Sequence, residues 1–478
     1  MPAGNVTAAL SGGTLEVLGD ATDNRVVLRG HGAGIVEVQG IGTTVNGGAG
    51  RATFAGVGRV RVLAADGDDR VTTKRLVLSD LYVSGGTGND VLRLEDTTDA
   101  GSGLAIALFG DEPAPSGVQT NGSDTILVTG TDVRSGEANV FVRGDYSFAD
   151  GSGGRDQITL ADTRIEADRF DLFVLAGGGA NDLGDAVTVE RLTATVAGES
   201  LSPFLLIVGS DGADTVRLRD VDLTFDSATD VFVDFGIGTG EGEDVIDAAR
   251  VSIEAISGTD EAGFGYFNQA GLNLIADTVR LTDSRVIGGA TVNVPFFGVG
   301  YTSGFVSVTG TVVDVRNVVL PGNGAAALSL QSMEAFDGVE RADVWSLTNV
   351  RVTSVTGELG DVVLDSYGGN DTIRVRNSSF ETVIVYLGEG DDSLTMVNTT
   401  GAAPFAAVGF GGIDAGGGDD QVTLVDCTFI GLPIDLGGGD DVLRLRGNMF
   451  ESVELFGGTD RLDRHGDLGQ ITIDGFEY

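Results

Sequence analysis

The chain has 478 residues, with 71 acidic and 29 basic side chains and a formal net charge of -42 at neutral pH. Such a charge excludes nucleic acid as a natural partner, because phosphate binding needs clustered cations. Glycine is abundant at 76 residues but proline is scarce at 8, so Pro-rich disorder is excluded as well. No apolar run reaches about 18 residues, and we expect no membrane span.

The N-terminal segment, residues 1–60, predicts a cap of short β-strands. It begins MPAGNVTAALSG, without the charged and apolar regions of a secretory signal peptide. The stretches TLEVLG, RVVLRG and IVEVQG alternate apolar and polar residues and are separated by glycine-containing turns. A repeat protein needs such a cap because its terminal strand edge would otherwise be unpaired.

A glycine- and aspartate-rich phrase then recurs between residues 61 and 468. Clear copies lie at 85–94, 387–396, 415–424 and 436–445, and each is followed by alternating apolar residues. Steps between copies run from about 20 to 35 residues, which indicates a stack of similar units. A longer gap before Asp343 predicts a degenerate copy near Asp314. The aligned aspartates are Asp69, Asp90, Asp124, Asp156, Asp185, Asp214, Asp244, Asp277, Asp343, Asp371, Asp392, Asp420, Asp441 and Asp460.

A second position, six residues beyond the aligned aspartate, favours Asp or Asn. These side chains tolerate left-handed backbone and bond nearby N–H groups, so a column of them predicts a corner at the same place in every repeat. The members are Asp96, Asp162, Asp220, Asp283, Asn349, Asn377, Asn398 and Asp426.

Strand, Asx corner, strand and glycine turn together make one coil of a parallel β-helix. We therefore predict an all-β fold, a single elongated right-handed parallel β-helix, or solenoid, of roughly 14 coils. The predicted domains are the cap at 1–60, the β-helix at 61–468 and a closing strand at 469–478, GQITIDGFEY.

Stacked carboxylates need an electrostatic explanation. Two carboxylates about 5 Å apart repel by about 0.8 kcal/mol even in water, and more near a protein surface. A divalent cation between turns would reverse the sign of that interaction. The turns offer only oxygen ligands, which suits Ca²⁺. Zinc is disfavoured because the two histidines, His31 and His465, are distant in the sequence and Cys427 is the one cysteine. A purely structural column of Asx turns is the alternative.

The segment GGTGNDVLR at 85–93 resembles the GGxGxD repeat of the RTX family, secreted bacterial β-roll proteins whose turns bind calcium. Copies ending at Asp392, Asp420 and Asp441 lack its first glycine. The phrase here occurs once per coil and not in tandem, so the chain also resembles large secreted bacterial right-handed β-helix repeat proteins. Together, the resemblance and the electrostatics predict these Ca²⁺ ligands: Asn89, Asp90, Asp371, Asp391, Asp392, Asp419, Asp420, Asp440 and Asp441.

The sequence gives little support for catalysis. Polysaccharide lyases and epimerases use β-helices, but such chemistry needs a base and charged partners on one face. The two histidines lie in the terminal segments, and an acidic pair that recurs in every coil is a structural signature. We predict no catalytic residue and no organic cofactor.

These observations predict an extracellular or cell-surface structural or adhesive protein, a calcium-stabilised rod that self-assembles into fibres or a surface layer. An extracellular location follows from weak calcium sites, which need millimolar calcium. Aromatic residues within 292–308 are candidates for either the core or an assembly surface. The alternative is a β-helix that binds or processes carbohydrate, with cell-surface polysaccharide as its partner.

Overall fold

The computed structural model divides into two compact units. Unit 1 comprises Met1–Ser227 and Val231–Val245, and unit 2 comprises Ala228–Asp230 and Ile246–Tyr478. The structure describes residues 4–32, 34–48, 50–111, 122–134, 136–145, 154–176, 184–197, 204–209, 212–225, 229–234, 243–255, 270–287, 304–322, 326–332, 334, 340–354, 360–401, 412–457 and 460–474.

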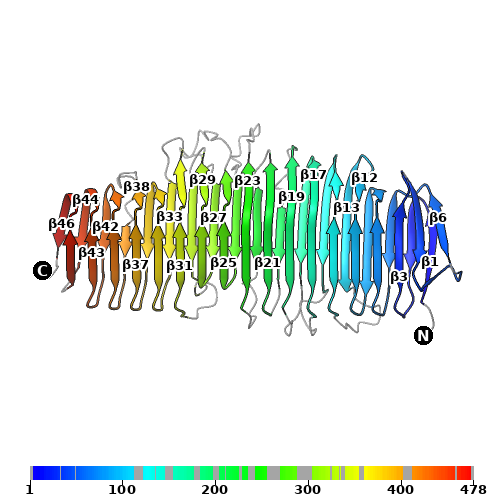
Figure 1. Cartoon of the computed structure of the whole chain (residues 1–478), viewed down its shortest axis with the longest axis horizontal. Helices are drawn as coiled ribbons and strands as arrows, with labels where there is room; N and C mark the ends of the chain where they lie inside the picture. The colour runs from blue at the N-terminus through cyan, green and yellow to red at the C-terminus, as the bar shows by residue number, and fades with distance from the viewer. Residues whose placement is uncertain are drawn as a thin grey trace, which may run out of the picture. The chain divides into compact units, whose positions relative to one another are not determined.

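Every element with defined bounds is a β-strand, from β1 to β46 (Figure 1). Strands of successive repeats pair in parallel and form long sheets, consistent with a β-helix or solenoid-like fold. The all-β prediction is confirmed. Among the described residues, no helix has the length and hydropathy needed to cross a membrane.

Unit 1 begins with antiparallel strands. β1 (Asn5–Ser11) pairs with β2 (Thr14–Leu18), and β4 (Ile35–Gly40) pairs with both β3 (Arg25–Gly30) and β6 (Arg51–Ala55). β2 and β3 are also parallel partners of β7 (Arg59–Leu63) and β8 (Arg70–Lys74). The predicted cap segment thus joins directly onto the parallel repeats.

The rest of unit 1 contains two main rows of parallel strands. The first row is β7, β10 (Asp80–Gly86), β13 (Gly103–Asp111), β16 (Glu137–Arg143), β18 (Arg169–Leu175) and β20 (Phe204–Val208). The second row is β8, β11 (Val91–Glu95), β14 (Thr125–Thr129), β17 (Gln157–Ala167), β19 (Ala186–Val196) and β21 (Thr215–Phe225). Short strands between them are β9 (Val77–Leu78), β12 (Thr98–Asp99) and β15 (Asp132–Val133). β5 spans Thr44–Val45. β22 (Thr229–Asp234) and β23 (Val245–Ala255) each contain residues of both units.

Unit 2 repeats this arrangement with three rows. One row is β25 (Thr278–Thr282), β28 (Val312–Arg316), β31 (Val344–Thr348), β34 (Thr372–Arg376), β37 (Ser393–Val397), β40 (Gln421–Val425), β43 (Val442–Arg446) and β45 (Arg461–His465). Another is β24 (Ala270–Ile275), β27 (Gly304–Thr309), β30 (Ala326–Gln331), β33 (Gly360–Asp365), β36 (Thr382–Tyr386), β39 (Gly412–Asp414), β42 (Leu432–Asp435), β44 (Met449–Phe456) and β46 (Leu468–Asp474). The third is β26 (Arg285–Ile287), β29 (Val319–Gly322), β32 (Arg351–Ser354), β35 (Ser379–Phe380), β38 (Thr400–Gly401) and β41 (Thr428–Phe429), which ends on β44.

The predicted alternation along the strands is confirmed. In β11, Leu92 and Leu94 are buried while Arg93 is exposed, and β34 shows the same pattern. Because the strands are in register, Leu92 lies opposite Val71 and Ile126 in the neighbouring strands. The buried apolar residues therefore stack in columns that run through successive repeats.

The predicted Asx corners are confirmed by the backbone. All eight predicted positions have positive φ, between 49° and 56°. Asn317 has the same conformation, and Asn349 donates a side-chain hydrogen bond to it at 2.9 Å. The sequence pattern missed Arg75, Arg191 and Arg250, which occupy equivalent left-handed positions.

The degenerate repeat predicted near Asp314 lies slightly earlier in the chain. β28 contains Asp314, which is half-buried and pairs with Arg316. The residue before β28, Thr311, accepts a bond from Val344 N–H where other repeats have their aspartate. This repeat therefore carries a threonine at the aligned position, which explains why the motif could not be found.

Aromatic side chains form a column on the outside of unit 1. The rings of Tyr82, Phe109, Phe141 and Phe173 follow one another with centroids 5.3, 5.4 and 6.3 Å apart.

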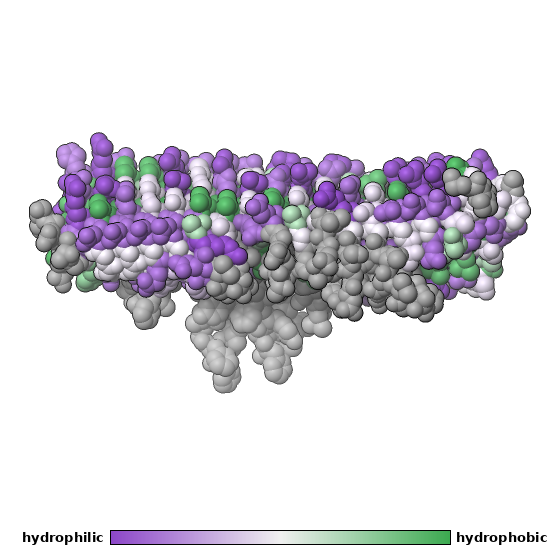
Figure 2. Space-filling view, turned by 90° about the horizontal axis from the view of Figure 1, so that it is seen from below, coloured by the Kyte–Doolittle hydropathy of each residue, from purple (hydrophilic) through white to green (hydrophobic). Residues whose placement is uncertain are grey.

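On the face in Figure 2, hydrophilic residues form rows and hydrophobic residues are scattered between them. Most of the aromatic stretch predicted within 292–308 lies outside the described residues.

Candidate functional site

A ladder of buried aspartates runs through each unit, immediately before the strands of one row. The main-chain N–H of each aspartate donates to Oδ1 of the aligned aspartate in the next repeat. In unit 1 the bonds, at 2.5–2.8 Å, link Asn24, Asp69, Asp90, Asp124, Asp156, Asp185, Asp214 and Asp244. In unit 2 they link Asp343, Asp371, Asp392, Asp420, Asp441 and Asp460 at 2.7–3.2 Å.

The second carboxylate oxygen of several ladder residues is buried without a hydrogen-bond partner among the described residues. They include the Oδ2 atoms of Asp69, Asp90, Asp124, Asp156, Asp371, Asp392, Asp420 and Asp441. An orphaned buried oxygen is costly, because it has lost its water and gained nothing in exchange. Each of these carboxyl groups therefore needs either a proton or a cation.

Burial sets the ionisation of the ladder. It raises the pKa of Asp90 to about 7 and that of Asp392 to about 8, against the opposing effect of the N–H bond that each accepts. The pKa of Asp420 rises to about 7 and that of Asp371 to about 6 for the same reason, and that of Asp441 also rises. Without a cation, part of the ladder is protonated at neutral pH.

A second, exposed ladder precedes the buried one by one residue. Asp419 N–H donates to Oδ1 of Asp391 at 2.9 Å, and Asp440 N–H donates to Oδ1 of Asp419 at 2.9 Å. Asn89 N–H donates similarly to Asp68 at 3.0 Å. Here the side chain accepts from the following repeat, whereas in the buried ladder it accepts from the preceding one. The predicted ligands Asn89, Asp391, Asp419 and Asp440 all lie in this exposed ladder.

The glycine turns stack directly on one another. Gly390 has φ +130°, and a Cβ at this position would overlap the carbonyl oxygen of Gly369 in the preceding repeat. Gly390 N–H donates to Gly417 O at 2.7 Å, and Gly418 N–H to Gly438 O at 2.8 Å. Glycine is required because only a residue without a side chain allows this approach. The turns are therefore held together by backbone hydrogen bonds.

The structure gathers carboxylates most closely in unit 1. Asp90, Asp111 and Asp124 each offer an oxygen within 4.8 Å of the others, and so do Asp124, Asp145 and Asp156. Among the described residues, these two are the groups of three side chains placed closely enough to hold one metal ion. Of the predicted ligands only Asp90 belongs to one. The other predicted ligands are stacked in rows, so their role stays a prediction.

Asp111 and Asp145 were missed by the sequence interpretation, although a signal was present. Asp111 lies opposite Gly86 in the parallel register, so it replaces the second glycine of the motif. Gly110-Asp111 and Gly144-Asp145 in the sequence correspond to Gly85-Gly86. The long segments that follow each pair separated these residues from Asp124 and Asp156 and hid the match.

The donor set fits calcium. The buried oxygens are carboxylates, which are ligands for a hard cation that takes six to eight oxygens. Cys427 is buried, and its desolvation raises the pKa of the thiol to about 11, so it provides no thiolate for a softer metal. The residues present thus suit Ca²⁺ better than zinc.

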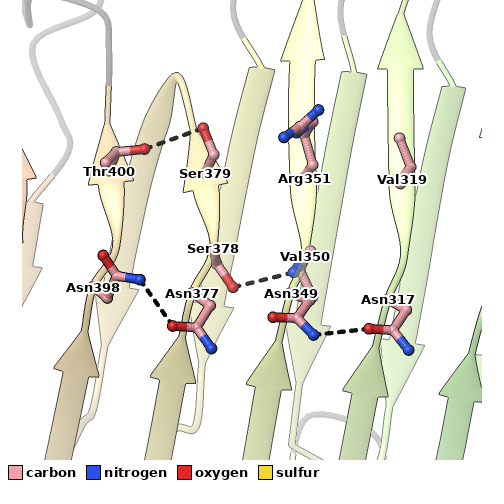
Figure 3. Close-up of a pocket in the computed structure, with 10 residues that line it drawn as sticks. All are labelled: Asn317, Val319, Asn349, Val350, Arg351, Asn377, Ser378, Ser379, Asn398 and Thr400. Carbon is pink, nitrogen blue, oxygen red and sulfur yellow. Dashed lines mark hydrogen bonds between the residues drawn. The ribbon is translucent and has the colours of Figure 1, made fainter.

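A shallow groove in unit 2 follows the corner column. It has a volume of about 500 Å³ and is lined by residues of four successive repeats. Figure 3 shows amide side chains at successive corners, with Asn398 bonded to Asn377 at 2.9 Å, and Thr400 bonded to Ser379 at 3.1 Å. Its lining offers amide and hydroxyl groups, with Arg351 as the basic residue.

Comparisons of the chain with protein-family models, curated proteins and solved structures found no match. The fold and the site define an all-β protein of parallel strand repeats that carries stacked, buried aspartates.

Proposed function

We propose that this protein is an extracellular structural or adhesive repeat protein, a right-handed parallel β-helix of about 14 coils stabilised by calcium. The observation that carries the proposal is the buried ladder, in which the orphaned oxygens of Asp90, Asp392 and Asp420 recur at equivalent positions. A buried carboxylate that lacks a partner is unfavourable, and a bound cation removes that penalty in repeat after repeat.

Calcium would act beside the turns and not between their backbones. Gly390 and Gly418 already use their N–H groups to bond the adjacent turns, so an intervening ion is not needed to hold the turn backbones together. The carboxylates of the exposed ladder, such as Asp391 and Asp419, carry charge at the surface beside those turns. A bound ion would reduce the repulsion along this row and favour the stacked state.

An extracellular location follows from this chemistry. Exposed carboxylate sites of this kind bind calcium weakly, and weak sites fill at millimolar concentrations. The resemblance of residues 85–93 to secreted RTX repeats supports the same location.

Self-association is the proposed assembly mode. In the part of the chain that the structure describes, β45 and β46 each pair with one strand, and Leu468 on β46 is 63% exposed. An unpaired parallel strand edge is a template for another chain. The antiparallel N-terminal strands act as the cap at the opposite end of the sequence, so growth through β46 would be directional.

The test compares calcium-dependent stability in two charge-matched variants. Asp392→Asn with Asp420→Asn removes two buried charges, whereas Asp426→Asn with Asp283→Asn removes two charges from left-handed corners that other repeats fill with asparagine. The first pair should lose much of the rise in melting temperature that calcium gives the wild type. The corner pair should retain it. An equal calcium response in all three proteins would contradict the proposal.

A second candidate function, carbohydrate binding, is favoured by the groove in unit 2. Its amides and hydroxyls, with Arg351, could hydrogen-bond a polysaccharide lying across successive repeats. Binding of acidic or neutral polysaccharide, lost in Arg351→Ala together with Asn377→Ala, would support this function. Unchanged binding in that variant would exclude the groove.

A further inference from the structure

The two groups of three carboxylates in unit 1 lie in consecutive repeats and share one residue. Asp90, Asp111 and Asp124 form the first group, and Asp124, Asp145 and Asp156 form the second. All five residues are buried, with at most 3% exposure. Asp124 therefore belongs to both groups and bridges them.

Each group contains buried oxygens that the fold leaves unsatisfied. Oδ1 of Asp90 and of Asp124 accepts an N–H bond from the preceding repeat, while Oδ2 of each has no partner among the described residues. In Asp111 the two oxygens exchange roles. Its Oδ2 accepts a hydrogen bond from Gly122 N–H at 2.6 Å, and its Oδ1 is buried without a hydrogen-bond partner among the described residues. In Asp90, Asp111 and Asp124, one carboxylate oxygen is thus fixed by the backbone and the other is available to a ligand.

Small residues provide the space for these oxygens. Oδ2 of Asp90 lies against Gly85, that of Asp124 against Gly110 and that of Asp156 against Gly144, and a Cβ at any of the three glycines would overlap it. The corresponding positions in unit 2 hold Leu387, Ala415 and Leu436, which are fully buried. These three repeats of unit 2 therefore lack the space that the glycines leave in unit 1.

The turn itself does not require an acid at these positions. Gly86 occupies the place of Asp111 in the neighbouring repeat. The bond from Gly122 N–H could be accepted equally by an asparagine, which would avoid burying a charge. Negative charge at Asp111 is therefore not explained by this backbone bond.

We propose that unit 1 holds a tandem divalent-cation site, with one ion bound by Asp90, Asp111 and Asp124, a second by Asp124, Asp145 and Asp156, and Asp124 bridging the two. Five carboxylates supply five negative charges against four positive charges of two ions, which is close to neutrality. The oxygen-only donor set selects Ca²⁺, with remaining positions filled by backbone oxygen or water. This site is independent of the predicted C-terminal ligands, but it shares Asp90 with the buried ladder on which the proposed function rests.

The electrostatics of the site agree with this assignment. Burial, followed by the negative charges of Asp124 and Asp145, raises the pKa of Asp111 to about 9. Burial likewise raises the pKa of Asp124 to about 8. A bound divalent cation favours the ionised form and would displace those protons, so calcium binding here should release protons.

The test counts the calcium ions bound by the metal-free full-length chain, by isothermal titration with CaCl₂ at pH 7.5. Asp111→Asn with Asp145→Asn keeps both acceptors for the backbone but removes the charge. Asp96→Asn with Asp162→Asn is the matched control, because both positions are left-handed corners that other repeats fill with asparagine. The first pair should bind two fewer ions than the wild type, and the control should bind the same number.

Additional variants distinguish loss of the unit 1 site from loss of C-terminal calcium binding and from a failure to fold. In a chain that already carries Asp392→Asn and Asp420→Asn, the unit 1 variant should still lose two ions, whether or not the C-terminal repeats bind any. Asp111→Gly with Asp145→Gly, which copies the glycine found at Gly86, replaces the asparagine pair if that pair does not fold. Identical stoichiometry and affinity in the wild type and both unit 1 variants would overturn the proposal, as would an absence of calcium binding by the wild type.

Discussion

Asp90 donates its main-chain N–H to Oδ1 of Asp124, 34 residues later, at 2.7 Å. A second bond has its donor in the later repeat, because Thr125 N–H donates to the carbonyl oxygen of Asp90 at 2.8 Å. Each aspartate of the ladder is thereby joined to its neighbour through both side chain and backbone. This double link fixes the register between repeats at the turn, immediately before each strand begins.

In the absence of calcium, the hydrogen-bond acceptor at the ladder position should matter more for stability than its negative charge. Asp392→Ala leaves Asp371 N–H buried without its partner and should lower the free energy of unfolding by about 1–3 kcal/mol. Asp392→Asn keeps an acceptor and should cost less in the presence of a chelator. Urea unfolding of both variants with EGTA measures the difference. Equal losses in the two variants would contradict this view.

Without calcium, the protein should become less stable as pH rises. Burial raises the pKa of Asp69 to about 8 and that of Asp343 to about 7, well above the unfolded value of about 3.9. The folded state therefore holds protons that the unfolded state has lost. The stability contributed by these groups is complete below the unfolded pKa and is lost as pH rises through the folded pKa.

Melting temperatures in EGTA should accordingly fall between about pH 4 and about pH 8. Asp69→Asn with Asp343→Asn should reduce that slope, because neither side chain then titrates. A slope as steep as that of the wild type would show that these two carboxyl groups are not its source.

Glycine at the stacked turn should be irreplaceable at one position and replaceable nearby. Gly390→Ala places a Cβ against Gly369 O at φ +130°, and should lower stability by about 1–3 kcal/mol. Gly438→Ala is the matched control, since a Cβ there meets nothing within 4 Å. Chemical denaturation of the two variants measures both effects. Equal stability of the two would refute the stacking requirement.

The left-handed corners should discriminate between side chains. Asn377 has φ +50°, a conformation that costs an ordinary residue about 1–2 kcal/mol. Asn377→Val should therefore be destabilising, whereas Asn377→Gly should cost less, although it loses the bond from Asn398. Thermal unfolding of the pair tests this order, and a valine variant at least as stable as the glycine variant would reverse it.

Much of the fold could be predicted because each repeat is determined by residues that are close together in the sequence. The alternating burial around Leu92 follows from the two-residue period of apolar side chains, and the corner at Asp96 follows from the tolerance of Asp and Asn for left-handed backbone. The structure contains both. The antiparallel pairing of β3 with β4 and the threonine at position 311 could not be predicted. They depend on partners distant in sequence or on a repeat without its motif.

The candidate site was predicted only in part, for a similar reason. Motif matching identified Asp90 and the C-terminal aspartates, because an intact phrase surrounds them. It missed Asp111 and Asp145, whose approach to Asp124 is created by strand register across repeats. Which carboxylates are buried, and which oxygens lack a partner, is decided by packing and not by the motif.

The most direct test of calcium binding by the stacked aspartates is the melting temperature of the metal-free wild-type chain at about pH 8, recorded with and without calcium. At this pH most ladder carboxyl groups with raised pKa values are close to ionisation and need a cation. We predict a rise in melting temperature that increases with calcium concentration; a gain of about 2.7 kcal/mol is expected when calcium is about 100 times its Kd. Magnesium at the same concentration should give a smaller rise. An identical melting temperature with and without calcium would contradict the claim that the stacked aspartates bind it.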